Sequence, residues 1–250
     1  MKYNRLRLAR WDVFHAAAKY DPRRNPILHV GAHYGEEKEE YRHIGFETVL
    51  WVEAQETAFA ILKKNVGENY CLHAGMWSVS DLEIELHITD NSVSTSFYKL
   101  DSNNHLFDSI KEVSVIKVKT ISLADTVDVF RSRGVLNEKF VLRLDVQGSE
   151  YAILKSSSSL LRDIDFICCE VTSKQQIYEN TQPRKKIVLF LLSQFWIPAF
   201  SKMNPETSHG ETIFIPIKRI GTFLIPIVYM RLISFIDNFR YKARKKLFRK

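Results

Sequence analysis

Short apolar runs alternate along the chain with segments whose apolar residues recur every three or four positions. Each run is rich in β-branched or aromatic residues and ends in a small or acidic residue, which is typical of a buried strand. The predicted strands are 26–30, 48–52, 70–74, 140–145 and 166–169. The predicted helices are 35–44, 57–66, 122–131, 183–194 and one beginning at Ser149, which suits an N-cap.

Strands that alternate with helices of about ten residues indicate right-handed βαβ units. Such units build a mostly parallel sheet with helices on both faces. The fold class that the sequence predicts is therefore α/β, doubly wound and Rossmann-like. Two segments break the alternation. Residues 82–88 and 113–118 read as an antiparallel hairpin insertion, and 195–200 and 211–216 as late strands that give the sheet an antiparallel edge.

The composition is that of one globular domain. The chain has 250 residues, 45% of them hydrophobic and 26% charged, which excludes wholesale disorder and fibrous structure. We expect an N-terminal helical segment at 1–24, a main domain at 25–219 and a C-terminal tail at 220–250. Three cysteines without C-x-x-C spacing provide no disulfide framework, and the first residues show no apolar signal segment, so we expect a cytoplasmic location.

The net charge of +7 lies entirely in the tail. Residues 231–250 hold eight Lys or Arg against one Asp, so the rest of the chain is neutral. A neutral body argues against nucleic acid as a partner. Residues 228–250 have the spacing of a basic amphipathic helix, which predicts either peripheral contact with a membrane surface or packing on protein. The apolar stretch 220–230 is too short to span a membrane.

The residues that end the predicted strands are the candidate binding residues. In an open parallel sheet, ligands bind at the carboxyl ends of the strands. These ends are Gly31, Glu53, the pair Ala74 and Gly75, Asp145 and Glu170.

The first strand end indicates which cofactor to expect. The turn after Gly31 lacks the G-x-G-x-x-G pattern that holds a pyrophosphate, whereas Glu53 stands 22 residues later, where a carboxylate accepts the ribose hydroxyls. A ribose site without a pyrophosphate site favours S-adenosylmethionine over a dinucleotide.

Other chemistries find little support in the sequence. His29 and His33 are four residues apart, but on a strand and turn rather than a helix, so we expect no metal site. No G-x-S-x-G elbow is present for a serine nucleophile. Taken singly, each glycine of the first turn is explained as well by backbone geometry as by ligand contact.

Several segments together resemble the FkbM family of S-adenosylmethionine-dependent methyltransferases. They are 29–35, 49–53, 211–216 and, most specifically, the fourth-strand segment 142–155 with Asp145, Gln147 and Gly148. The resemblance implies a class I methyltransferase fold. It further implies that Gly31, Ala32, His33 and Gly35 line the methionine end of the cofactor, Glu53 and Ala54 its ribose, and Ala74, Gly75 and Met76 its adenine. The chain departs from the family pattern at His33, Ala54, Gln147 and Ser156.

The resemblance also implies O-methylation of a sugar, a glycan or a small hydroxylated metabolite. Asp145 is the first candidate for the base or acceptor-orienting residue and Glu170 the second, while a role of Asp145 in cofactor binding alone stays open. A nucleic-acid methyltransferase is disfavoured, because no Asn/Asp-Pro-Pro-Tyr/Phe motif follows the fourth strand. A non-catalytic module that binds membrane surfaces through the tail is the third alternative.

Overall fold

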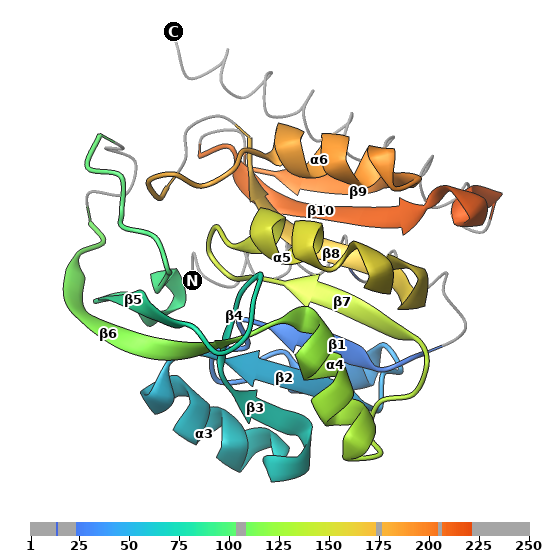
Figure 1. Cartoon of the computed structure of the whole chain (residues 1–250), viewed down its shortest axis with the longest axis horizontal. Helices are drawn as coiled ribbons and strands as arrows, with labels where there is room; N and C mark the ends of the chain where they lie inside the picture. Colours follow the sequence, from blue (N-terminus) through green and yellow to red (C-terminus); the bar gives the residue numbers. More distant parts are fainter. Residues whose placement is uncertain (1–13, 15–23, 104–108, 174–176, 205–206, 222–250) are drawn as a thin grey trace, which may run out of the picture.

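The computed structural model describes residues 14, 24–103, 109–173, 177–204 and 207–221 (Figure 1). Most of the predicted N-terminal segment 1–24 and of the tail 220–250 lies outside the described residues. The prediction of an amphipathic helix at 228–250 is therefore not addressed by the structure.

A seven-stranded sheet forms the centre of the molecule, in the order β3-β2-β1-β7-β8-β10-β9. The first five strands in this order, from β3 to β8, pair in parallel with one another, as the sequence predicts. The strands are β1 (Ile27–Val30), β2 (Val49–Glu53), β3 (Cys71–His73), β7 (Phe140–Leu144), β8 (Ile164–Thr172), β9 (Trp196–Met203) and β10 (His209–Pro216). The order reverses between β1 and β7, and this switch point is where a crevice opens in doubly wound folds.

Helices cover both faces of this sheet because alternate strand residues point to opposite sides. Leu28 and Leu142 belong to a core packed against α4 (Leu123–Ser132), α5 (Glu150–Ser156) and α6 (Arg184–Ser193). Their neighbours Ile27 and Val141 belong to a second core, which includes residues of α2 (Lys38–His43) and α3 (Glu56–Val66). The α/β class is confirmed.

The sequence predicts an antiparallel strand at the edge of the sheet. In the structure the antiparallel strand lies one position in from the edge. It is β10, which pairs with β8 on one side and β9 on the other. The crossover through α6 places β9 two positions beyond β8 and parallel to it, and β10 then turns back to fill the position between them. The edge strand β9 therefore runs parallel to the main set.

The predicted hairpin insertion is confirmed. β5 (Glu83–Thr89) pairs antiparallel with β6 (Glu112–Ile121), and the short β4 (Gly75–Met76) pairs in parallel with β6. This three-stranded sheet stands at the same end of the molecule as the carboxyl ends of β1 and β2 (Figure 1).

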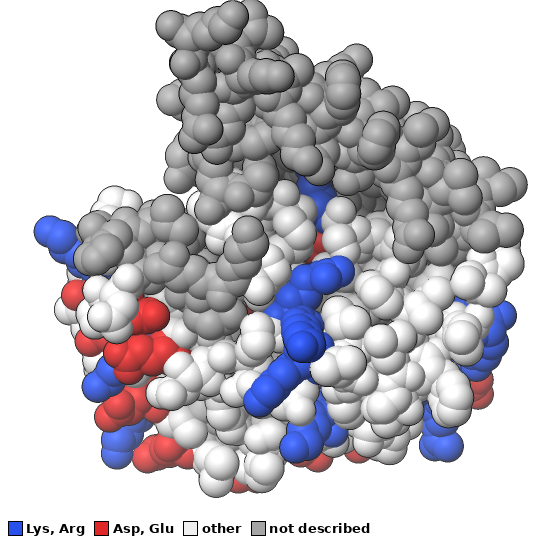
Figure 2. All heavy atoms as spheres, turned by 90° about the horizontal axis from the view of Figure 1, so that it is seen from above, with Lys and Arg blue, Asp and Glu red and all other residues white. Residues whose placement is uncertain are grey.

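The described surface carries charges of both signs. Figure 2 shows a short row of Lys and Arg side chains on one face, with Asp and Glu side chains gathered beside one edge of that face. Within the described ranges, no helix is long and apolar enough to cross a membrane.

Candidate functional site

A cavity of about 1160 Å³ opens at the carboxyl ends of β1, β2, β7 and β8. Pockets for small molecules measure roughly 300–1000 Å³, so this cavity has room for a cofactor and a second molecule together. Its walls come from the strand ends, from segment 91–97 of the insertion and from the turn between β9 and β10.

Nearly all the predicted site residues line this cavity. They are Gly31, Ala32, His33, Glu53, Ala54, Ala74, Met76, Asp145 and Glu170. Gly35 and Gly75 do not line it. A Cβ on Gly35 would lie 2.8 Å from the Leu62 side chain, and one on Gly75 would lie 2.4 Å from the Phe97 ring, so both glycines serve packing.

Gly31 lets the first turn approach the fourth parallel strand closely. Its φ is +78°, and a Cβ at this position would lie 1.9 Å from the Asp145 carbonyl oxygen. Only glycine fits there. The turn and Asp145 are thereby held against each other at the switch point of the sheet.

Glu53 is fixed with both carboxylate oxygens accepting backbone hydrogen bonds. The His33 N–H donates to Oε2 over 2.8 Å and the Gln55 N–H to Oε1 over 2.7 Å. The side chain is 9% exposed, and burial raises the pKa of its carboxyl group. Each oxygen keeps a further lone pair, which suits acceptance from two vicinal hydroxyls of a ribose.

His33 links the first turn to the insertion. Its φ is +47°, and its ring nitrogens lie 2.9 Å from Glu36 Oε1 and 2.9 Å from Ser92 Oγ. The His33 backbone therefore holds Glu53 while its ring holds the insertion. The sequence analysis placed His33 at the cofactor, and the structure adds this second connection.

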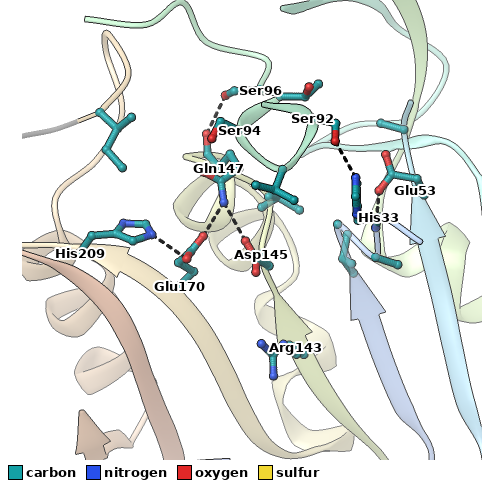
Figure 3. Close-up of a pocket in the computed structure, with 18 of the residues that line it drawn as sticks. His33, Glu53, Ser92, Ser94, Ser96, Arg143, Asp145, Gln147, Glu170 and His209 are labelled. Atoms are coloured by element: carbon teal, nitrogen blue, oxygen red, sulfur yellow. Dashed lines mark hydrogen bonds and ion pairs between the residues drawn. The ribbon is translucent and has the colours of Figure 1, made fainter. Parts of the chain in front are cut away.

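Four side chains from the end of β7, from β8 and from the start of β10 form one hydrogen-bonded row (Figure 3). Gln147 Nε2 donates to Asp145 Oδ1 over 2.8 Å and also to Glu170 Oε2. The other oxygen of Glu170 lies 2.6 Å from His209 Nε2. Glu170 is 4% exposed, so this carboxylate reaches the cavity while being supported from two sides.

The loop that carries Gln147 is held by Glu150. Its carboxyl group accepts hydrogen bonds from the backbone of Val146 and Gly148, at 3.3 and 3.0 Å, and burial raises its pKa to about 7. Ser149 is the N-cap residue of this helix, as predicted, but its hydroxyl makes no capping bond. The Glu150 carboxyl group accepts the free backbone donors instead.

The segment 91–98, which we call the strap, passes over the cavity. The Ser96 hydroxyl donates to the Gln147 carbonyl oxygen over 2.6 Å, and the Tyr178 hydroxyl lies 2.9 Å from the Ser94 carbonyl oxygen. The strap and His209 were not predicted from the sequence. Neither has a local signal, because their contacts join residues that are 39 to 84 positions apart in sequence.

A buried ion pair fixes β10 beneath the site. Arg143 Nη2 lies 2.7 Å from Glu211 Oε1, with both side chains almost fully buried. Because Arg143 is on β7 and Glu211 on β10, the pair spans β8 and sets the position of the turn that carries His209. Among the described residues, no group of three or more His, Cys, Asp or Glu is arranged to hold a metal ion.

The family model described as the methyltransferase FkbM domain matches residues 29–206. No curated protein sequence matches the chain significantly.

Several solved structures are similar to this chain at low sequence identity. A protein of the NADB-Rossmann superfamily from Streptococcus agalactiae is 10% identical, covers 80% of this chain and has a TM-score of 0.44, and this chain spans 65% of it. The glycopeptide N-methyltransferase MtfA is 9% identical over 83% of this chain and 90% of its own, with a TM-score of 0.42. An S-adenosylmethionine-dependent methyltransferase from Aquifex aeolicus is 10% identical over 84% and 92%, with a TM-score of 0.39.

Proposed function

The chain belongs to the FkbM methyltransferase family, and we propose that it transfers a methyl group from S-adenosylmethionine to a hydroxyl group of a sugar, a glycan or another small hydroxylated metabolite. One observation carries the proposal: three carboxylates line the same cavity. Glu53, at the end of β2, is placed to accept ribose hydroxyls, and Asp145 and Glu170 lie at the carboxyl ends of two other strands, β7 and β8.

The residues present fit the cofactor of the family, S-adenosylmethionine. Gly31 removes the side chain that would block the first turn, and Glu53 offers two oriented acceptors for ribose hydroxyls. Ala54, Ala74 and Met76 line the neighbouring wall with small or apolar surface, which suits a flat base. The cofactor supplies a methyl group on a positively charged sulfur, ready for in-line displacement.

The protein then has to orient an acceptor hydroxyl and remove its proton. The acceptor oxygen forms a bond to the methyl carbon as the sulfur–carbon bond breaks, and the hydroxyl proton passes to a carboxylate. We assign this role to Asp145, which ends β7 beside the first turn. Glu170 is the second candidate, and a buried carboxylate of this kind is a typical proton acceptor.

The test is transfer of radiolabelled methyl from S-adenosylmethionine to a glycan and metabolite extract, followed by identification of the methylated atom. We expect label on ether oxygens with the wild-type protein. Asp145→Asn should lose transfer by more than about a hundredfold, the usual size of a general-base contribution. Asp128→Asn, which changes an exposed acid on α4, is the matched control and should behave as wild type. Label on nitrogen would refute the proposed reaction. Full transfer by Asp145→Asn would refute the assignment of Asp145 as the proton acceptor and pass that role to Glu170.

A further inference from the structure

Gln147 lies between the two carboxylates that the proposed reaction uses. We propose that its side-chain amide takes the position of a cation there and holds Asp145 and Glu170 aligned for methyl transfer without a divalent metal. The inference rests on the proposed function for its catalytic consequence. The structural part of the inference, that a neutral donor replaces a cation between the two carboxylates, can be tested without measuring methyl transfer.

Both hydrogens of the Gln147 amide are used in hydrogen bonds. Nε2 has two hydrogens, and its two acceptors are Asp145 Oδ1 and Glu170 Oε2. The opposite end, Oε1, lies 2.9 Å from the Tyr178 hydroxyl. This surrounding fixes the amide orientation, because a flipped amide would point its oxygen at two carboxylates.

The backbone prevents Gln147 from turning away. Its φ is +52°, and its carbonyl oxygen accepts the hydrogen bond from Ser96 of the strap. The next residue, Gly148, has a φ of +114°, and a Cβ on it would lie 2.4 Å from the Thr181 side chain. With Glu150 holding the loop from the other side, the amide is held in place before any ligand binds.

Two carboxylates that accept from the same nitrogen atom are near enough to need a shared proton, a cation or strong donors. His209 supports the far oxygen of Glu170, and Gln147 supplies the donors between the two carboxylates. Nε2 bridges the two carboxylates, as a bound cation would. Its distance of 2.8 Å to the Asp145 oxygen is somewhat longer than the distance of about 2.3–2.6 Å at which Ca²⁺ binds carboxylate oxygens. A carboxylate at position 147 would remove both donors and add a third negative charge. Three carboxylates around one point are a ligand set that divalent cations prefer. The choice of Gln over Glu therefore decides whether this site needs a metal.

The experiment compares Gln147→Glu and Gln147→Met with the wild-type chain. Gln147→Glu preserves the size of the side chain, and Gln147→Met preserves its length without donors. Gln194→Glu introduces the same charge outside the cavity and is the matched control. Binding of Mn²⁺ is measured by electron paramagnetic resonance, and methyl transfer to the extract is measured with EDTA and with added Mn²⁺.

We expect wild-type transfer to be the same with EDTA and with Mn²⁺. Gln147→Met should lose transfer by more than about tenfold in both conditions, because misaligned groups lose the benefit of positioning, while its S-adenosylmethionine affinity stays within about threefold of wild type. Gln147→Glu should bind Mn²⁺ and recover transfer only with the ion. Gln194→Glu should show neither effect. Rescue by a cation in one variant alone is a result that loss of folding cannot produce.

Three results would overturn the inference. They are a wild-type activity that EDTA abolishes and Mn²⁺ restores, a Gln147→Glu variant that binds no Mn²⁺, and a Gln147→Met variant with normal transfer. The Mn²⁺ measurement needs no methyl acceptor. If the wild-type protein transfers no label at all, the proposed function fails, and Mn²⁺ binding by Gln147→Glu still reports separately on the amide.

Discussion

Glu53 offers the sharpest test of the cofactor site. Replacing it with Ala removes both acceptors for the ribose hydroxyls. Hydrogen bonds to a charged group contribute about 1.5–3 kcal/mol each, so two of them amount to about 3–6 kcal/mol of binding free energy. A tenfold change in affinity corresponds to about 1.4 kcal/mol. Even when water replaces much of the lost interaction, Glu53→Ala should weaken S-adenosylmethionine binding more than about tenfold.

The same substitution also affects the fold, and the structure shows why. The His33 and Gln55 N–H groups both donate to Glu53, and each would lose its partner. An unsatisfied buried donor costs about 1–3 kcal/mol. Glu53→Gln is the gentler variant, because its amide oxygen can still accept one of the two backbone bonds while the negative charge is gone.

The assay is isothermal titration of S-adenosylmethionine into the wild-type protein, both Glu53 variants and Glu56→Gln. Glu56 is an exposed acid three residues further along and is the matched control. Circular dichroism and thermal unfolding show which variants remain folded. A folded Glu53→Gln variant with an affinity within about threefold of wild type would refute the assignment of Glu53 to the ribose, since the loss of charge-assisted bonds predicts a larger effect.

Three further predictions concern stability and the tail. Burial raises the Glu150 pKa to about 7, so the stability that the protonated side chain contributes is present at low pH and is lost as the pH rises through 7. Between pH 5 and pH 8, the free energy of unfolding of the wild type, measured in urea, should fall by about 2–3 kcal/mol relative to that of Glu150→Gln. The same pH dependence in both proteins would contradict this. Gly31→Ala should destabilise the chain by more than about 3 kcal/mol, against about 1–2 kcal/mol for Gly134→Ala, because both have positive φ but only the first meets a backbone oxygen. Equal losses of stability in the two variants would show that the close approach of Gly31 to the Asp145 carbonyl oxygen does not determine the effect. We also propose that the basic tail binds anionic membranes, so the full chain should sediment with phosphatidylserine vesicles in low salt and a chain ending at Ile220 should not. Equal sedimentation of both chains would refute the anchor.

The parallel part of the fold could be predicted from sequence because its signals are local. A buried strand shows as a short apolar run, and its neighbours in a βαβ unit follow at regular spacing. Glu53, Asp145 and Glu170 were found in the same way, since strand ends in a parallel sheet meet at one edge. The position of β10 was not predictable from its own residues. It depends on which gap the β9–β10 hairpin enters, and this is decided by pairing with β8, about 40 residues earlier.

The residues that the sequence did not identify are those whose role depends on distant partners. His209 gains its role from Glu170, and Ser96 from the Gln147 carbonyl oxygen. In the sequence, Gln147 stands out only as a departure from a family pattern. Its role depends on the fold, which brings both carboxylates within hydrogen-bond distance of its Nε2 atom.

The two halves of the cavity differ in what builds them. The half around Glu53 consists of the ends of β1 and β2 and the glycine turn, which are held by the sheet itself. The half around Asp145 and Glu170 is closed by the strap and by the β9–β10 turn, which are attached through side-chain hydrogen bonds. Substitutions in the strap can change these contacts without disturbing the sheet, because loops tolerate variation that strands do not. On the proposed function, this division assigns cofactor binding to the rigid scaffold and the choice of acceptor to the attached segments.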